Sequence, residues 1–388
     1  MKVAIASTGR FHVLDLAREL DRQGLDVAFH SYVPRKRAQA FGLPARCHRS
    51  MLPYLAPLVA WERLAPRARP AAQERAMAIA LNAVVTARLQ PCDVFICMSG
   101  MYLEAARFAK ERYGAQVWLE RGSRHILSQR DILREVGARG PTQFIVDREL
   151  AGYELADRIV VPSSHVVESF AEHQPGVMHK LFVNPYGVDL DQFPQRTVRR
   201  ANETPTILFV GGWSKRKGAD LLEGAIRQLN GVRLLHVGAI IDTPFPSDDT
   251  RFTHVDPVAQ WKLSEYYRQS DVFALASREE GLAMVQVQAL ASGLALVCTH
   301  RTGGADLALS PKLADQIFVA SLDPVAIAKA IEAAVQKAAL GPVRLEEADR
   351  DLLSWRAYAS RYGLELSRVR KTPPPDRRTP PQAEGIPQ

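Results

Sequence analysis

The chain has 388 residues, of which 47% are hydrophobic and 24% charged, and its formal net charge is +8. This composition is typical of a globular protein with room for two domains, and it excludes a chain that is mainly disordered. The four cysteines have neither metal-ligand spacing nor a disulfide-dense pattern, which fits a reducing compartment. No apolar run approaches the roughly 18 residues that predict a membrane helix. We therefore expect a cytoplasmic protein.

The basic surplus is concentrated at the N-terminus, because residues 1–100 carry fourteen Lys and Arg against seven Asp and Glu. The basic residues are not interleaved with aromatic ones and no nucleic-acid-binding motif is present, so we expect no nucleic acid partner. The basic stretch from Arg35 to Arg69 surrounds the apolar segment Met51 to Trp61. This pattern resembles an interfacial segment that contacts an anionic membrane surface. A solvated basic face on a helical insert explains it equally well.

The first half of the chain alternates apolar runs of strand length with helical patterns, which predicts a parallel α/β sheet. The predicted strands include Lys2 to Ser7, Asp26 to Ser31, Asp93 to Met98, Gln116 to Leu119 and Leu181 to Val183. Open α/β sheets bind ligands beyond the carboxyl ends of their strands. The polar residues after the first strand, Gly9 and His12, and those after the fourth, Glu120 and His125, are therefore candidates. An ion pair of Glu120 with Arg121 or Arg124 is the structural alternative.

A glycine-bounded basic loop opens the second half. The strand Thr206 to Val210 is followed by Gly211-Gly212-Trp213-Ser214-Lys215-Arg216-Lys217-Gly218, and a helical pattern from Ala219 to Leu229 comes next. The first amides of a helix have no partners within the helix, and they favour an anion. Together with three adjacent cations, they predict a cradle for a diphosphate. The turn before this domain, Asn184 to Phe193, predicts a positive φ angle at Gly187.

A strand, loop, helix and strand follow between Asp271 and Thr299. Leu282, Val285, Ala289 and Leu290 give the helical spacing, and Glu280 stands at the entrance to the helix. This position suggests a carboxylate that accepts hydrogen bonds from ligand hydroxyls while nearby amides contact phosphate. The alternative is an acid in the first helical turn, without a ligand. After the second strand, Thr302-Gly303-Gly304 allows a ligand to approach the backbone closely.

These motifs resemble a known family. Glu280-Gly281, a polar Gln288 eight residues after the glutamate, Ala289 to Gly293 and Gly303-Gly304 are similar to the donor-site signature of family 4 glycosyltransferases. Lys217-Gly218 and Gly187-Val188-Asp189 also match the pattern. Two residues depart from it: Gln288 stands where a second glutamate is usual, and Gly212 stands where an arginine is usual, so we expect Arg216 to supply the missing charge.

The resemblance implies the GT-B fold, in which two Rossmann-like domains with parallel sheets face a cleft, and retaining transfer from a nucleotide diphosphate-sugar. We expect no obligatory metal or other cofactor, because no paired acidic motif of the Asp-x-Asp type stands at a strand end. It implies that Lys217 and Arg216 neutralise the leaving diphosphate, that Glu280 orients the donor sugar, and that Gln288 binds the ribose. The remaining donor-binding candidates are Gly211, Gly212, Gly281, Leu282, Thr302, Gly303 and Gly304. His125 and Glu120 are catalytic candidates in the first domain, although His125 comes several residues late for the pattern. Gly9 and His12 are placed on the acceptor side.

We accordingly predict four segments. They are an acceptor-side domain at 1–195, a donor domain at 196–345, a C-terminal helix at 346–368 that crosses back to the first domain, and a disordered Pro-rich tail at 369–388. The predicted acceptor is a glycan or a lipid-linked molecule, and the pathway is cell-surface polysaccharide or glycolipid synthesis. A non-catalytic nucleotide-sugar or glycan-binding protein and a sugar-nucleotide epimerase are the alternatives on the same scaffold, because fold does not determine chemistry.

Overall fold

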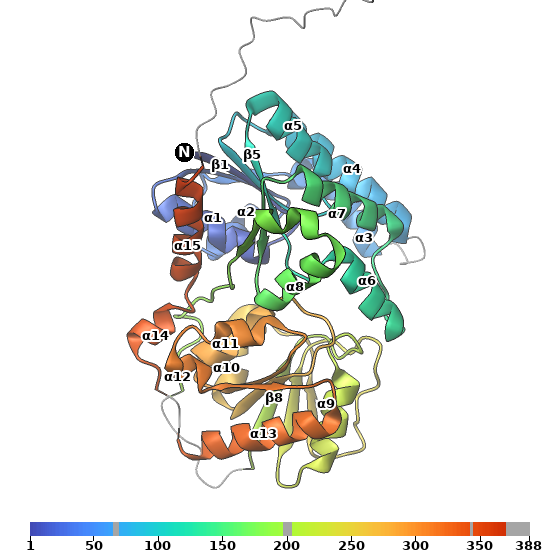
Figure 1. Ribbon diagram of the computed structural model, residues 1–388, viewed down its shortest axis with the longest axis vertical. Helices are drawn as coiled ribbons and strands as arrows, with labels where there is room; N and C mark the ends of the chain where they lie inside the picture. Colours follow the sequence, from blue (N-terminus) through green and yellow to red (C-terminus); the bar gives the residue numbers. More distant parts are fainter. Residues whose placement is uncertain (65–69, 197–203, 342–343, 370–388) are drawn as a thin grey trace, which may run out of the picture.

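The computed structural model describes residues 1–64, 70–196, 204–341 and 344–369. Each half of the chain forms its own α/β unit (Figure 1). The predicted disordered tail, apart from Val369, lies outside the described residues. The described helices include none with the combination of length and apolar character that a membrane span requires.

The first sheet has seven parallel strands among the described residues, in the order β3-β2-β1-β4-β5-β6-β7. The strands predicted from the apolar runs of this half are confirmed, whereas the three-residue β3 was not predicted. Their bounds are β1 Lys2–Ala6, β2 Asp26–Ser31, β3 His48–Ser50, β4 Val94–Met98, β5 Gln116–Glu120, β6 Arg158–Val161 and β7 Leu181–Val183.

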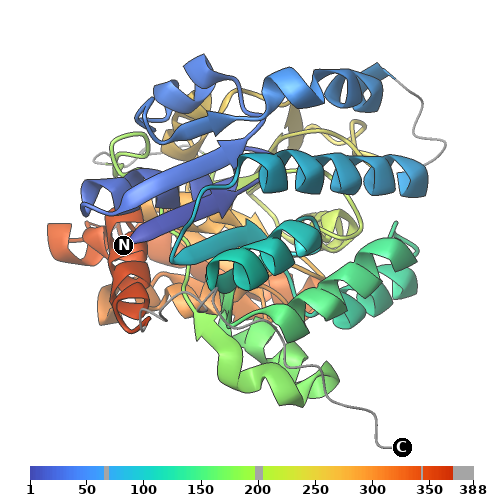
Figure 2. The ribbon, with the colours of Figure 1, turned by 90° about the horizontal axis from the view of Figure 1, so that it is seen from above.

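Helices cover both faces of this sheet (Figure 2). Alternate residues of β1 serve the two faces, because Val3 and Ile5 belong to one core cluster while Ala4 and Ala6 belong to the other. The helices are α1 Phe11–Arg22, α2 Arg35–Ala40, α3 Leu52–Leu64, α4 Pro70–Arg88, α5 Leu103–Tyr113, α6 Ile126–Glu135, α7 Gln143–Leu155 and α8 Ser164–His173, with a 3₁₀ turn at Pro175–Lys180.

The second sheet has six parallel strands among the described residues, in the order β10-β9-β8-β11-β12-β13. Their bounds are β8 Thr206–Val210, β9 Arg233–Val237, β10 Phe252–Val255, β11 Val272–Leu275, β12 Ala295–Thr299 and β13 Ile317–Ala320. The helices of this half are α9 Ala219–Gln228, α10 Leu263–Arg268, α11 Met284–Ala291, α12 Pro311–Ala314 and α13 Pro324–Ala339, with 3₁₀ turns at Gln260–Lys262 and Gly303–Leu307. Asp323 caps α13 through the amide of Ala326, at 2.8 Å.

The C-terminal segment returns to the first domain (Figure 1). It forms two helices, α14 Glu347–Asp351 and α15 Trp355–Ser367, where the sequence predicted one. The break has a local cause, since Ser354 caps α15 by accepting a hydrogen bond from the amide of Ala357 at 3.0 Å. α15 packs against α1, and Arg158 of the first sheet pairs with Glu365 at 3.0 Å.

Gly187, in the segment before the second domain, packs closely against the C-terminal segment. The predicted positive φ angle is wrong, because Gly187 is not among the residues with positive φ. A Cβ atom built at Gly187 would instead lie 2.6 Å from the carbonyl oxygen of Ser354 and 2.7 Å from Cα of Trp355. The glycine is thus required by the close approach of two backbone segments, which also form a parallel bridge between Val188 and Ser354.

We expect Gly187→Ala to lower the free energy of unfolding by about 1–3 kcal/mol, because the new methyl group meets backbone that cannot move independently. Chemical denaturation measures the change. Gly176→Ala is the matched control, since a Cβ atom there meets nothing within 4 Å. Equal stabilities of the two variants would contradict this account of Gly187.

Candidate functional site

Three loops meet at the carboxyl ends of β8, β11 and β12. The amide of Arg278, in the loop after β11, donates to the carbonyl of Arg216, in the loop after β8, at 2.9 Å. The amide of Glu280 donates to the carbonyl of Arg301, in the loop after β12, at 3.2 Å. Gly218, at φ 68°, lies so close to Ala276 that a Cβ atom would stand 1.9 Å from its carbonyl oxygen. The backbone therefore joins the basic loop to the Glu280 loop.

Four charged side chains gather where these loops meet. The Lys217 ammonium contacts the Glu280 carboxylate directly. Arg216 Nε donates to Glu279 Oε2 at 2.9 Å, and its Nη2 lies 3.8 Å from Glu280 Oε2. The structure thus brings the neighbours Arg216 and Lys217 together with Glu280, which lies more than sixty residues further along the sequence. Glu279 joins them without having been predicted.

The pairing decides the protonation of Glu280. Burial alone would raise the pKa of its carboxyl group, but the charges of Lys217 and Arg216 outweigh burial and hold the pKa below its usual value. Burial also opposes the charge on Arg216, yet Glu280 and Glu279 raise the pKa of its guanidinium. These pKa shifts keep Glu280 a carboxylate and Arg216 a charged guanidinium at neutral pH.

Glu279 connects the two domains. Its side chain is fully buried, and besides Arg216 it accepts from the amide of Arg124 at 3.3 Å and from Gln129 Nε2 at 3.2 Å. Both of these donors belong to the first domain. The Glu-Glu doublet was the only signal in the sequence, because the partners of Glu279 are remote along the chain.

Gly281 and Gly303 lie where the first domain touches the second. The carbonyl of Gly281 accepts from Ser163 Oγ at 2.8 Å, and a Cβ atom at Gly281 would stand 2.1 Å from the carbonyl oxygen of Gly122. A Cβ atom at Gly303 would meet Cβ of Ser163 at 2.6 Å. These glycines, predicted to let a ligand approach, thus allow one domain to approach the other. Leu282 beside them is buried.

The other donor-side candidates are held by local hydrogen bonds. α11 begins at Met284 after Ala283, so Glu280 lies in the preceding loop, and its interpretation as an acid of the first helical turn is wrong. Gln288 is buried on α11, and its amide oxygen accepts from the Tyr267 hydroxyl at 3.0 Å. Thr302 Oγ1 accepts from Gln286 Nε2 at 3.0 Å and from the amide of Gly304 at 3.3 Å.

The glycines at the start of the basic loop are anchored to the neighbouring strand β9. The amide of Gly211 donates to the carbonyl of Val237, and its own carbonyl lies 2.9 Å from His236 Nε2. A Cβ atom at Gly212 would meet Ile241 Cγ1 at 3.0 Å. Gly212 therefore leaves no room for a larger side chain unless Ile241 moves.

In the first domain, the structure brings together two candidates that the sequence had assigned to different roles. His12 Nε2 lies 2.8 Å from Glu120 Oε2, and the hydroxyl of Tyr362 donates to Glu120 Oε1 at 2.8 Å. All three side chains are buried, and the His12 ring lies 4.4 Å from that of Tyr186. Tyr362, which belongs to α15, was not predicted.

The structural alternative for Glu120 is wrong, because Arg121 pairs with Glu149 at 3.0 Å and Arg124 with Glu172 at 3.4 Å. On the same side of the first sheet, Gly9 accepts from Ser7 Oγ at 3.0 Å. Phe11 follows with a positive φ of 31° and a half-exposed ring. A non-glycine residue with positive φ is strained, and such strain is concentrated at functional loops.

His125 lies elsewhere. Its fully buried ring caps α6 and packs against Tyr153, Phe170 and His173, with centroid distances of 5.1, 4.9 and 5.3 Å. Burial lowers the pKa of this imidazole to about 4. The structure therefore places His125 in the packing of α6, α7 and α8, away from the Lys217–Glu280 pair.

A different histidine, His165 on α8, lies beside Glu280. Ser163 Oγ contacts its Nδ1 at 2.9 Å, while its buried Nε2 has no hydrogen-bond partner among the described residues. Burial and Arg124 lower the pKa of His165 to about 4, against the opposing charge of Glu280. The run Pro162-Ser163-Ser164-His165 carried no recognisable signal for this position.

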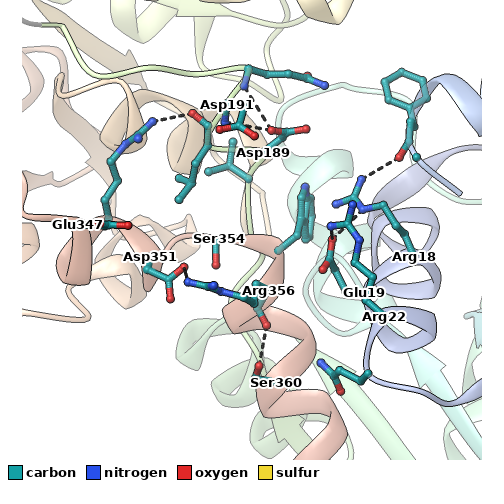
Figure 3. A pocket seen from close by; sticks show the side chains of 18 of the residues that line it. Arg18, Glu19, Arg22, Asp189, Asp191, Glu347, Asp351, Ser354, Arg356 and Ser360 are labelled. Carbon is teal, nitrogen blue, oxygen red and sulfur yellow. Dashed lines mark hydrogen bonds and ion pairs between the residues drawn. The ribbon is translucent and has the colours of Figure 1, made fainter.

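A separate cavity lies apart from this cluster. It has a volume of about 1120 Å³ and is bounded by α1, residues 188–195 and the segment from α14 to α15 (Figure 3). Arg18 and Arg22 pair with Glu19 there, and Arg356 pairs with Asp351. None of the predicted site residues lines this cavity. The described residues also contain no group of three or more His, Cys, Asp or Glu side chains placed to hold a metal ion.

The arrangement of two parallel sheets is the GT-B fold. Sucrose-phosphate synthase from Thermosynechococcus elongatus superimposes with a TM-score of 0.67 at 17% identity, covering 95% of this chain and 99% of that one. The structure of Anabaena Alr3699/HepE in complex with UDP and glucose gives a TM-score of 0.65 at 14% identity, covering 95% and 100%. The predicted fold class is confirmed.

The second domain also identifies a family. Residues 204–337 match the family model for glycosyl transferases group 1, so this domain is a group 1 glycosyl transferase domain and the resemblance seen in its motifs is confirmed.

Curated relatives match over shorter lengths. D-inositol 3-phosphate glycosyltransferase of Mycobacteroides abscessus is 29% identical over 40% of this chain and 39% of its own. GDP-mannose-dependent alpha-mannosyltransferase of Mycobacterium tuberculosis is 30% identical over 40% of this chain and 42% of its own length. The aligned part is thus less than half of these relatives.

The lowered pKa of Glu280 predicts an acid-sensitive contribution to stability. A carboxyl group whose pKa is depressed in the folded protein stabilises it above the unfolded-state pKa, and this stabilisation is lost as the pH falls through the folded-state pKa. We expect wild-type protein to lose more stability than Glu280→Gln between about pH 5 and pH 3. Denaturant titrations across this range measure the difference, and parallel pH profiles would contradict the pairing.

Proposed function

We propose that the protein is a glycosyltransferase that moves a sugar from a nucleotide diphosphate-sugar to an acceptor hydroxyl with retention of configuration. The observation that carries this proposal is the meeting of Lys217 and Glu280 at the carboxyl edge of one parallel sheet. The group 1 match of this domain supports it, and so do the transferase activities of the curated relatives and the UDP complex of a structural neighbour.

In the proposed donor chemistry, the diphosphate of the donor competes with Glu280 for the positive charges of Lys217 and Arg216. In the structure Lys217 and Glu280 neutralise each other. A diphosphate entering at the start of α9 offers Lys217 and Arg216 a partner of higher charge, which frees a Glu280 oxygen to accept hydrogen bonds from sugar hydroxyls. The two cations then stabilise the negative charge that develops on the leaving diphosphate as the anomeric bond breaks. Gln288 would contact the ribose, while Thr302, Gly303 and Gly304 line the same edge.

On the acceptor side, His12 and Glu120 form a buried hydrogen-bonded pair below the loop that carries Gly9. We assign this loop to a glycan or lipid-linked acceptor, with a role in cell-surface polysaccharide or glycolipid synthesis. Glu120 fixes the orientation of the His12 ring, and Tyr362 fixes Glu120 in turn.

A two-stage experiment tests this function against its alternatives. A thermal-shift screen across nucleotide-sugars identifies the donor, because a ligand that binds only the native state raises its apparent stability. The purified protein is then incubated with that donor. Transfer or donor hydrolysis excludes a non-catalytic binding protein, whereas interconversion of the free nucleotide-sugar without an acceptor identifies an epimerase.

Substitutions of Lys217 and Glu280 should differ in their effects on turnover and on affinity for the nucleoside diphosphate. We expect Lys217→Ala to lower kcat by on the order of 100-fold or more, because it removes a cation from the leaving group. Glu280→Gln should impair transfer but leave affinity for the free nucleoside diphosphate nearly unchanged, since it removes a charged acceptor for sugar hydroxyls. Calorimetry with the nucleoside diphosphate separates the two roles. Comparable losses of that affinity in both variants would refute the assignment.

We also propose that the basic N-terminal surface contacts anionic lipid. Arg35, Lys36 and Arg37 on α2 are exposed, whereas the side chains of Arg63, Arg67 and Arg69 lie outside the described residues. Charge reversal on α2 should weaken binding to acidic liposomes, and wild-type binding should fall as salt increases. Arg134→Glu on α6 is the control. Equal wild-type binding to neutral and acidic liposomes would rule the contact out.

A further inference from the structure

A second cavity, of about 240 Å³, lies in the first domain between the sheet and the end of α4. The strand register explains why it is hollow. Ala4 of β1 lies opposite Ala28 of β2, and Ala6 lies opposite His30. Because alternate residues of a strand share a face, Ala4, Ala28 and His30 point to the same side, and the two small alanines leave the space open.

The walls of this cavity carry positive charge without a matching acid. Arg49 of β3 and Arg88 at the end of α4 both line it, and neither forms an ion pair within the described ranges, although Arg49 Nη1 donates to the carbonyl of Arg46. The one acid among the lining residues, Asp26, is exposed at the start of β2. The Arg88 guanidinium is held in place by the Tyr54 hydroxyl, to which its Nη1 donates at 2.8 Å.

Two nitrogen atoms at this cavity also lack hydrogen-bond partners in the part of the chain that the structure describes. They are Arg88 Nε and His30 Nδ1, both buried, and His30 as a whole is 1% exposed. Buried polar groups in native proteins are nearly always hydrogen-bonded, so each exception calls for a missing partner. The unpartnered N–H group of Arg88 Nε lies in the same cavity wall as the guanidinium of Arg49. These two groups together favour an acceptor that carries negative charge.

We propose that this cavity binds a phosphate-class oxyanion, either free phosphate or the phosphate group of an ester. Arg49 and Arg88 neutralise the charge, and neutral His30 donates a hydrogen bond from its ring. The site goes beyond the proposed glycosyl transfer. It shares no lining residue with the basic loop at Gly211–Gly218 and belongs to the other sheet.

The surroundings of Arg88 indicate which kind of organic group a bound phosphate ester can have. Arg88 also lines a neighbouring apolar hollow of about 270 Å³, formed with Tyr54, Ala83, Val84 and Ala87. The Arg88 guanidinium lies 5.0 Å from the centre of the half-exposed Tyr54 ring. A phosphate ester with an apolar group could therefore place its phosphate between the arginines and its apolar part along α4.

The test measures phosphate binding by calorimetry in a Lys217→Ala background, which removes the main cation of the donor loop. Arg49→Gln and Arg88→Gln should each weaken inorganic phosphate binding by on the order of tenfold, since each removes a charge-assisted hydrogen bond. Ala28→Leu should abolish it by filling the floor while keeping every charge. Arg134→Gln, a solvent-exposed arginine on α6, should change nothing.

Vesicles of phosphatidylcholine with and without phosphatidic acid distinguish the two sources of phosphate. If the ligand is a lipid, Ala28→Leu weakens binding to the phosphatidic acid vesicles; if it is soluble, only the binding of inorganic phosphate and glycerol 1-phosphate falls. The proposal is overturned if Arg49→Gln, Arg88→Gln and Ala28→Leu all match Arg134→Gln towards every ligand. Arg49 is exposed, so its variant remains informative if Ala28→Leu fails to fold. Because Lys217 is absent throughout, failure here leaves the proposed transferase function untouched.

Discussion

The pairing of two cations with two adjacent carboxylates is the interaction on which the rest of this site depends. Glu279 and Glu280 are neighbours in sequence, yet Glu279 reaches Arg216 and two groups of the first domain, whereas Glu280 faces Lys217. A buried charge is tolerated only when it is paired and hydrogen-bonded. Arg216 contacts both carboxylates, so the donor loop and the contact between the domains are coupled electrostatically.

Glycine provides the second constraint. Gly281 and Gly303 allow the backbone and Ser163 of the first domain to approach the Glu280 loop, and Gly187 allows the chain before the second domain to approach Ser354. A methyl group at any of these positions would collide with atoms of another segment. Glycines that a motif associates with ligand binding therefore set how closely the two domains can meet.

The sequence predicted what is encoded locally. Most strands follow from short apolar runs, and the basic loop and Glu280 follow from motifs confined to one turn each. Prediction failed where a residue's role depends on partners that are far away in the sequence. The partner of Glu120 proved to be His12, 108 residues away, and Tyr362 is 242 residues away. The backbone that requires Gly187 to be a glycine belongs to Ser354, and the burial of His125 depends on the packing of three helices. No periodicity or spacing contains such information.

The C-terminal segment joins these long-range contacts into one mechanical element. α15 is fixed to the first domain through Tyr362 and Glu120, while Arg350 of α14 donates to the carbonyls of Leu190 and Phe193 and, at 3.2 Å, to that of Ala291 in the second domain. Between α14 and α15 the chain is tied to the segment before the second domain, since the amide of Val188 donates to the carbonyl of Leu353 at 2.8 Å. This is where the helix is interrupted by the Ser354 cap, and where the cavity of about 1120 Å³ adjoins the chain. The residues from Leu352 to Ser354 therefore join the contacts of α14 with the second domain to those of α15 with the first.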